Sequence, residues 1–251
     1  MSGRKIEGSV ALVTGANRGI GRAITDALLE RGAKKVYATA RDPKTLEALK
    51  QRHGSRVVPL RLDVTRADQV AEIARQAPDV DLLFNNAGVL EATELTSEAT
   101  VDQARREMEV NYFGPLRMLQ RFADTLAQRG GAIVNIGSAA GLTNVPFFPT
   151  YSASKAALHS LTQASRVLLA ARGVAVFGVY AGPVDTDMTK GLPLEKTSPQ
   201  DVAKGVLDGV EAANDDIFPD PFAVAFGEQF HSSPKGSERQ VAAMVSGASA
   251  A

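Results

Sequence analysis

The stretch "VTGANRGIGRA" at residues 13–23 decides the fold, because an apolar run gives way there to three spaced glycines and then to a helical pattern. Gly15, Gly19 and Gly21 allow a tight turn from a strand into a helix and let a phosphate group approach the backbone. The spacing G-x-x-x-G-x-G differs from the common dinucleotide pattern, and the absence of a following Lys-Ser or Lys-Thr pair disfavours a nucleotide-hydrolysing loop. The stretch therefore indicates a phosphate-binding turn, with a purely structural turn as the alternative.

The rest of the chain alternates between short apolar runs and longer segments of helical period. The expected strands lie within residues 9–15, 35–40, 56–64, 80–88, 131–138 and 174–183. These runs are apolar on both faces, as strands covered by helices must be. The alternation predicts an α/β fold with a doubly wound, mostly parallel sheet. We expect one domain over residues 1–245 and a disordered tail over 246–251.

The composition excludes several classes of protein. The 251 residues include no cysteine, three histidines, and 28 cationic and 28 anionic side chains. Disulfides, thiolate metal sites and cysteine nucleophiles are therefore excluded, and the widely separated histidines disfavour a metal site. The balanced charge disfavours nucleic-acid and membrane partners. No apolar run is long enough for a signal peptide or a membrane span, so we expect a soluble, cytoplasmic protein.

The residues after the second expected strand should read the adenosine ribose of a dinucleotide, because ligands bind beyond the carboxyl ends of such strands. Ala40 leaves no carboxylate at the strand end, and Arg41 and Asp42 follow it. Arg18 in the glycine loop adds a second guanidinium, a group that binds phosphate in a bidentate way. This arrangement favours NADP(H) over NAD(H). The alternative is two solvated arginines, with Arg41 paired to Asp42.

Further motifs follow the glycine loop in a fixed order: "DVT" (63–65), "NNAG" (85–88), "VNYFG" (110–114), "IGSAAG" (136–141), "YSASK" (151–155) and "AGPVDTDM" (181–188). Together with "TGANRGIG" (14–21), this set resembles the short-chain dehydrogenase/reductase family over about residues 8–212. The resemblance implies a single Rossmann-like domain with about seven parallel strands. It also implies a homodimer or homotetramer that assembles through the segments 100–128 and 150–172.

The resemblance and the loop positions together assign a cofactor site. The predicted NADP(H)-binding residues are Gly15, Asn17, Arg18, Gly19, Ile20, Gly21, Arg41, Asp63, Val64, Asn86, Ala87, Gly88, Tyr151, Lys155, Pro183, Val184 and Thr186. Asp63 is also a candidate N-cap for the helix that follows it, and residues 86–88 could form a purely structural turn.

The spacing of Tyr151 and Lys155 places a phenol and an ammonium on one face of a helix. A phenol has an ordinary pKa of about 10, which a neighbouring ammonium lowers. Tyr151 could then donate a proton to a carbonyl oxygen or accept one from an alcohol, while Ser138 hydrogen-bonds the same oxygen. The resemblance adds Asn111, with a distorted helix backbone and a water that links it to Lys155. The predicted catalytic set is Asn111, Ser138, Tyr151 and Lys155.

Apolar side chains surround the expected substrate position: Leu142, Val145, Phe147, Phe148, Met188, Leu192 and Leu194. An apolar pocket with one polar end suits a hydrophobic ketone or aldehyde, although the phenylalanines could instead be core or subunit contacts. The sequence thus predicts an NADPH-dependent carbonyl reductase that acts reversibly. The alternatives are an NAD-linked secondary-alcohol dehydrogenase and an NADP(H)-binding redox sensor without turnover. The segment after residue 216 either closes the sheet or covers the site of a neighbouring subunit.

Overall fold

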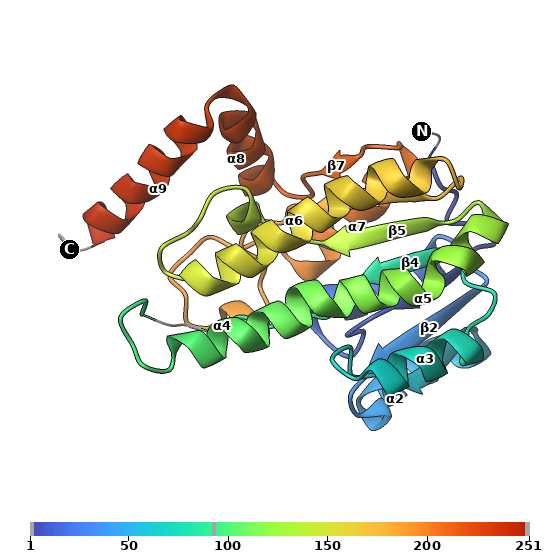
Figure 1. Cartoon of the computed structure of the whole chain (residues 1–251). Helices are drawn as coiled ribbons and strands as arrows, with labels where there is room; N and C mark the ends of the chain where they lie inside the picture. The colour runs from blue at the N-terminus through green and yellow to red at the C-terminus, as the bar shows by residue number, and fades with distance from the viewer. Residues whose placement is uncertain (1–2, 92–93, 249–251) are drawn as a thin grey trace.

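The protein is built on a seven-stranded parallel sheet in a computed structural model that describes residues 3–91 and 94–248 (Figure 1). The strands are β1 (Val10–Val13), β2 (Lys35–Ala40), β3 (Val57–Arg61), β4 (Leu82–Asn85), β5 (Ala132–Ile136), β6 (Ala175–Val179) and β7 (Asp216–Ile217). They lie in the order β3-β2-β1-β4-β5-β6-β7, and every neighbouring pair is parallel. The predicted α/β fold and its approximate number of strands are confirmed.

Helices cover both faces of this sheet. They are α1 (Gly19–Glu30), α2 (Glu47–His53), α3 (Ala67–Gln76), α4 (Thr100–Met108), α5 (Gly114–Arg129), α6 (Pro149–Ala170), α7 (Pro199–Glu211), α8 (Pro221–Ser232) and α9 (Pro234–Ala248). Helices α3, α5 and α6 lie in front of the sheet in Figure 1, and α7 lies behind it. Alternate residues of β1 lie on opposite faces of the sheet. Ala11 and Val13 pack in one hydrophobic core, and Val10 and Leu12 pack in the other. Two cores on one sheet explain why the strands are apolar on both sides.

The long helical segment from residue 100 to residue 129 is interrupted in the middle. A π-helical turn, Glu109–Phe113, joins α4 to α5 and contains Asn111. Such a turn widens the helix locally and is frequent at functional sites. The backbone distortion that the family resemblance implied at this position is therefore present.

The topology places the loops of interest at one edge of the sheet. Strand β1 lies between β2 and β4, so the chain adds strands first on one side of β1 and then on the other, which makes β1/β4 the topological switch point of the sheet. In parallel sheets such a switch point opens a crevice beyond the carboxyl ends of the strands. The loops that follow β1, β2, β4, β5 and β6 all end at this crevice.

The C-terminal segment closes the sheet and then packs on its own chain. Strand β7 pairs with β6 at the sheet edge, and α8 and α9 form a helical pair that projects beside α6 (Figure 1). Val241 of α9 packs with Phe226 of α8 and with Ala139, which follows β5. The segment therefore covers a loop of the site edge.

The predicted disordered tail, 246–251, overlaps the end of α9. The helix continues to Ala248, while 249–251 lie outside the described residues, so the tail and the single-domain bounds stay predictions. Among the helices of the described ranges, none combines the length and the apolar character needed to span a bilayer.

Candidate active site

The loop between β1 and α1 is shaped by glycines. Gly15 has a φ of 67°, a conformation that residues with a side chain rarely adopt. A Cβ atom on Gly21 would lie 2.3 Å from both the Asn86 side-chain nitrogen and the Gly15 carbonyl oxygen. The Asn86 Nδ2 donates to the carbonyl oxygens of Thr14 and Gly15 at 2.8 and 3.1 Å. The loop therefore forms a backbone cradle at a helix N-terminus, which is the arrangement that binds pyrophosphate.

Thr14 joins the ends of β1 and β4. Its hydroxyl oxygen accepts hydrogen bonds from the backbone N–H groups of Asn86 and Ala87, both at 2.9 Å. Sequence reasoning missed this residue, although a threonine between a buried strand and a glycine is a recognisable signal for a side chain that bonds the backbone.

A cavity of about 600 Å³, here called the strand-end cavity, runs along the carboxyl ends of the strands. Its wall includes every predicted cofactor residue except Pro183 and Val184. Val184 is buried, and its backbone bridges to Thr197. The volume, the glycine cradle and the position at the switch point of the sheet fit a dinucleotide.

The two arginines predicted to meet a 2′-phosphate differ in their partners. Arg41 is exposed on the cavity wall, and within the described residues no ion pair or hydrogen bond holds its guanidinium. The Asp42 carboxylate instead caps the short 3₁₀ helix Pro43–Leu46 by accepting from the Lys44 N–H at 3.0 Å, so the alternative Arg41–Asp42 pair does not form. Arg18 pairs with Asp187 at 2.9 Å. One guanidinium is therefore open to an anion, and the other is held by a carboxylate.

Asp63 lies on the same wall but does not cap a helix. Its carboxylate accepts hydrogen bonds from the backbone N–H and the hydroxyl of Thr65, at 3.0 and 2.8 Å. Helix α3 begins after Arg66, which makes no side-chain cap. The expectation that Asp63 is the N-cap is wrong, because its carboxylate closes a local turn instead.

Tyr151 lies in the first turn of α6 with its side chain buried and on the cavity wall. Ser138 lies two residues after the end of β5 and is the N-cap of the short 3₁₀ helix Ala139–Gly141, whose Ala140 N–H donates to the Ser138 hydroxyl at 3.2 Å. Burial is the largest effect on the pKa of Tyr151 and raises it to about 12. A hydrogen bond with Ser138 has a smaller, lowering effect on this pKa, and the charge of Glu107 raises it. The phenol is therefore neutral near pH 7, which is the form that donates a proton.

Lys155 lies one turn further along α6 and is also buried. Its Nζ donates to the Ile136 carbonyl oxygen at 2.8 Å and stands 5.6 Å from the centre of the Tyr151 ring. Burial lowers the pKa of Lys155 to about 8. The pKa of Tyr151 is thus raised and not lowered, because the cost of burying a phenolate is the largest effect on it and Lys155 is not among the causes of its shift.

Asn111 uses its side chain to hold the chain after β4. Its Oδ1 accepts from the Val89 N–H, and its Nδ2 donates to the Val89 carbonyl oxygen and the Ser154 hydroxyl, all at 2.9 Å. Asn111 and Lys155 both lie close to Gly88, since a Cβ there would be 3.3 Å from Oδ1 and 3.6 Å from the lysine Nζ. The structure therefore brings the two side chains to one glycine, while their link through a water stays a prediction.

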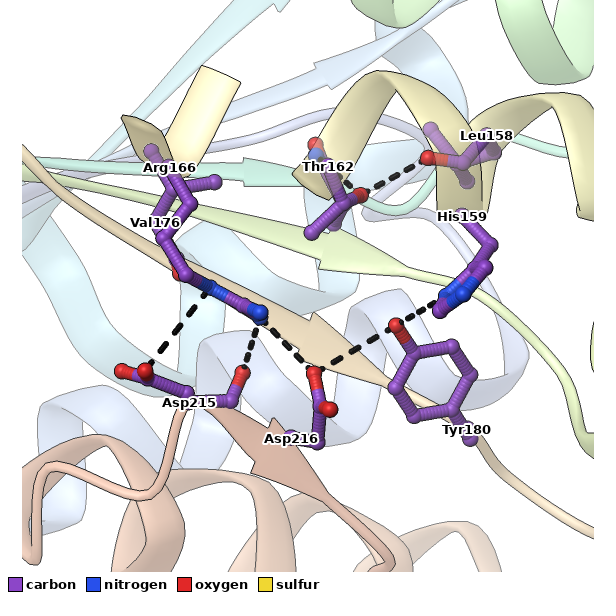
Figure 2. A network of polar contacts seen from close by, with 9 residues as sticks. Leu158, His159, Thr162, Arg166, Val176, Tyr180, Asp215 and Asp216 are labelled. Atoms are coloured by element: carbon purple, nitrogen blue, oxygen red, sulfur yellow. Dashed lines mark hydrogen bonds and ion pairs between the residues drawn. The ribbon is translucent and has the colours of Figure 1, made fainter. Parts of the chain in front are cut away.

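A polar network holds α6 against the sheet, beyond the part of this helix that carries the candidates Tyr151 and Lys155 (Figure 2). Arg166 donates to the Asp216 carboxylate on β7 at 2.7 Å. The His159 Nδ1 lies 2.6 Å from the hydroxyl of Tyr180, which directly follows β6. Because His159 follows Lys155 by one helical turn, these contacts hold the face of α6 that carries the catalytic candidates.

Asp220 is a second residue that sequence reasoning missed. Its buried carboxylate accepts from the Gly182 N–H at 2.9 Å and caps α8 by accepting from the Ala223 N–H at 2.8 Å. It thus ties α8 to the segment that leads to Thr186. An aspartate before a Pro-initiated helix is a recognisable N-cap signal, but the contact with Gly182 is tertiary.

The apolar side chains predicted for the substrate wall differ in their exposure and in what they pack against. Met188 lies on the strand-end cavity, and Met188, Phe147 and Leu194 are 40%, 49% and 51% exposed. Leu142 instead packs against the small core formed with Phe226 and Val241. Leu142 therefore contributes to a small core, a role that the sequence left open for the phenylalanines only.

Comparisons with known proteins agree with this geometry. Residues 9–197 match the family model for short chain dehydrogenases. A short chain dehydrogenase from Burkholderia cenocepacia, solved in complex with NADP, is 37% identical with a TM-score of 0.87, over 95% of this chain and 99% of that chain. One from Burkholderia phymatum, solved with NAD, is 26% identical with a TM-score of 0.81, over 92% and 96%. The NADPH-dependent 1-acyldihydroxyacetone phosphate reductase of Saccharomyces cerevisiae is 34% identical over 202 residues, 75% of this chain and 65% of that protein.

The family model covers residues 9–197, which is most of the chain, and Tyr151 and Lys155 lie on the strand-end cavity, whereas Ser138 and Asn111 are not part of its wall. The chain belongs to the short-chain dehydrogenase family of oxidoreductases, whose members bind nicotinamide cofactors.

Proposed function

We propose that the protein uses NADPH to reduce the carbonyl group of a hydrophobic ketone or aldehyde, in a reversible reaction with Tyr151 as the general acid. One observation carries the proposal: the buried, neutral phenol of Tyr151 reaches the wall of the strand-end cavity beside the Ser138 hydroxyl. A neutral hydroxyl at that place can protonate an oxygen on which negative charge develops.

Three of the four catalytic candidates, Tyr151, Ser138 and Lys155, have separate tasks in this proposal. NADPH, when bound, supplies a hydride to the carbonyl carbon. Tyr151 donates its proton to the carbonyl oxygen, and the Ser138 hydroxyl hydrogen-bonds the same oxygen. The Lys155 ammonium favours the phenolate that the transfer leaves behind. In the reverse direction the Tyr151 phenolate accepts the proton of an alcohol.

Arg41 supports NADPH as the preferred cofactor. Its guanidinium is exposed on the cavity wall, and the residue before it, Ala40, supplies no carboxylate for a ribose hydroxyl. The NADP in the Burkholderia cenocepacia structure and the NADPH in the name of the yeast reductase agree with this choice. The NAD in the Burkholderia phymatum structure supports the second candidate, an NAD-linked alcohol dehydrogenase.

Exposed apolar side chains support a hydrophobic substrate and an oligomer. Phe147, Met188 and Leu194 offer apolar surface from the two segments predicted to line the substrate site. On α6, Val167 and Leu168 are 76% and 73% exposed, as we expect if the segment 150–172 contacts another subunit in a homodimer or homotetramer.

The direct test is the oxidation of NADPH against a panel of aliphatic, aromatic and cyclic ketones and aldehydes, with NADH as the matched cofactor. We expect turnover with NADPH on apolar members of the panel. Tight NADPH binding without turnover on any member would contradict the proposal and support the redox sensor, and turnover with NADH alone would support the dehydrogenase.

A further inference from the structure

A carboxyl group lies buried near the catalytic candidates, and no cation among the described residues forms an ion pair with it. Glu107, on α4, has no exposed surface. Its Oε1 accepts from the Glu91 N–H at 2.8 Å, but its Oε2 is buried and has no hydrogen-bond partner among the described residues. The adjacent Arg106 points elsewhere and binds the Glu91 carboxylate at 2.6 and 2.9 Å. Half of the hydrogen-bonding capacity of Glu107 is thus unused in a place where that is costly.

A second unpartnered oxygen belongs to the helix that carries Tyr151. Helix α4 packs against α6, and Thr150 directly precedes Tyr151 in the first turn of α6. The Thr150 hydroxyl oxygen is also buried without a hydrogen-bond partner among the described residues. It lies near enough to Glu107 to lower the pKa of that carboxyl, although the two groups form no hydrogen bond of good geometry here. One proton shared between the two oxygens would satisfy both.

Burial raises the pKa of the Glu107 carboxyl above its usual range. Burial is the largest effect on this pKa. The Glu91 N–H and the Thr150 hydroxyl have the opposite effect, and each lowers the pKa of Glu107 by a smaller amount. The Glu91 carboxylate raises this pKa and the Arg106 guanidinium lowers it, and these two charges largely offset each other because they form an ion pair. A neutral Glu107 can donate from Oε2 while it accepts at Oε1.

Glu107 also holds part of the cavity wall. Asn111 lies one turn further along, in the π-helical turn that continues α4, and its side chain binds the N–H and the carbonyl oxygen of Val89. Glu107 accepts a hydrogen bond from the N–H of Glu91. Two side chains of one helix therefore clamp the segment 89–91, and Val89 lies on the strand-end cavity. The same carboxyl group faces Thr150 on α6.

We propose that Glu107 is a positioning residue, whose buried carboxyl group fastens the segment 89–91 to the first turn of α6 and so sets the place of the Tyr151 phenol at the substrate. The inference rests on the proposed function, because it assigns the proton transfer to Tyr151. With no exposed surface, Glu107 acts through its neighbours and does not touch the substrate.

The test compares Glu107→Gln, which keeps one acceptor and one donor, with Glu107→Leu, which keeps the size and removes both. We expect kcat of the leucine variant to fall about 10-fold to 100-fold, the usual effect of a misplaced catalytic group, with the NADPH dissociation constant unchanged. We expect the glutamine variant to stay within about threefold of the unmodified protein, as a net change of one hydrogen bond predicts. Asp102→Asn, an exposed charge change on the same helix, is the control and should leave kcat unchanged.

A spectroscopic readout separates this role from simple packing. In infrared difference spectra near neutral pH, the carbonyl band of a protonated carboxylic acid should be present in the unmodified protein and absent in Glu107→Gln. Absence of that band from both proteins would overturn the proposal. It would also be overturned by full turnover in Glu107→Leu, or by equal losses in the leucine and glutamine variants.

Two further variants keep the result interpretable. If Glu107→Leu does not fold, Thr150→Val removes the other oxygen, and we expect kcat to fall about 3-fold to 10-fold, the effect of losing the one hydrogen bond that the proposal places between Thr150 and Glu107. Unchanged kcat in Thr150→Val would overturn the proposal. Tyr151→Phe is measured alongside: full activity there refutes the proposed function itself, whereas an inactive Tyr151→Phe beside a fully active Glu107→Leu refutes only the role of Glu107.

Discussion

The Arg18 guanidinium and the Asp187 carboxylate lie 2.9 Å apart and join the glycine loop to the segment after β6 across the strand-end cavity. Both side chains are more than half exposed, so the pair is weak and can be replaced by another anion. In the proposed function that anion is the 2′-phosphate of NADPH, which must compete with Asp187 for Arg18.

Replacement of Asp187 by asparagine should therefore tighten NADPH binding. We expect the NADPH dissociation constant to fall by up to about fivefold, the value of an exposed ion pair, with the NADH constant unchanged. Fluorescence titration with both cofactors measures the effect. An equal change for both would show that Asp187 acts on the segment after β6 and not on the phosphate.

Arg41→Ala tests the guanidinium that has no partner in the described structure. We expect NADPH to bind about 10-fold to 100-fold more weakly, because a charge-assisted hydrogen bond to phosphate is lost, and NADH to bind as before. Arg22→Ala, on the exposed side of α1, is the matched control. Equal losses for NADPH and NADH would remove Arg41 from the recognition of the 2′-phosphate.

Lys155→Met should stabilise the protein near pH 7 while it abolishes turnover. Burial lowers the folded-state pKa of Lys155 from 10.5 to about 8, so the folded state carries the full cost of a buried ammonium below about pH 8. Between about 8 and 10.5 the unfolded chain binds more protons at this site than the folded one, and the stability of the unmodified protein therefore rises with pH.

The methionine variant lacks this cost at every pH. We expect the free energy of unfolding to rise by roughly 1–3 kcal/mol at pH 7, after the lost hydrogen bond to Ile136 is counted. The gain should become smaller as the pH rises toward the pKa of a free lysine amine. Denaturant unfolding at several pH values measures it. A stability difference that does not change with pH would contradict a buried ammonium.

The pH dependence of the two reaction directions should differ. Reduction needs the Tyr151 phenol, which is already the dominant form because burial raises its pKa to about 12. Oxidation needs the phenolate, so its kcat/KM should rise by up to about tenfold per pH unit over the neutral to moderately alkaline range. Parallel assays of the alcohol and carbonyl substrates measure both profiles. A pH-independent oxidation rate would argue against Tyr151 as the base.

The sequence predicts the architecture well because the signals are local. Each of the six apolar runs contains one of the strands β1–β6. The glycine loop uses the positive φ of Gly15 and the missing side chain of Gly21, where a Cβ would clash with Asn86. The π-helical turn at Asn111 was reached only through the family resemblance, because nothing in the residue pattern of a helix marks one widened turn.

The parts that escaped prediction depend on tertiary burial. Glu107 stands in the charged stretch "RREME", which is typical of a solvated helix surface, yet its side chain faces α6 and is buried. The pKa of Tyr151 was misjudged for the same reason: the spacing to Lys155 is visible in the sequence, whereas the burial of both groups is not. The Asp220 contact with Gly182 joins residues far apart in the chain.

The most direct test of the central claim is a single-turnover measurement of NADPH oxidation in Tyr151→Phe beside the unmodified protein. The phenylalanine ring keeps the packing of α6 and removes only the proton donor. We expect the rate of hydride transfer to fall about 10²-fold to 10⁴-fold, with the NADPH dissociation constant within about twofold of its original value. An unimpaired rate in this variant would contradict the assignment of Tyr151 as the general acid and with it the account of the site.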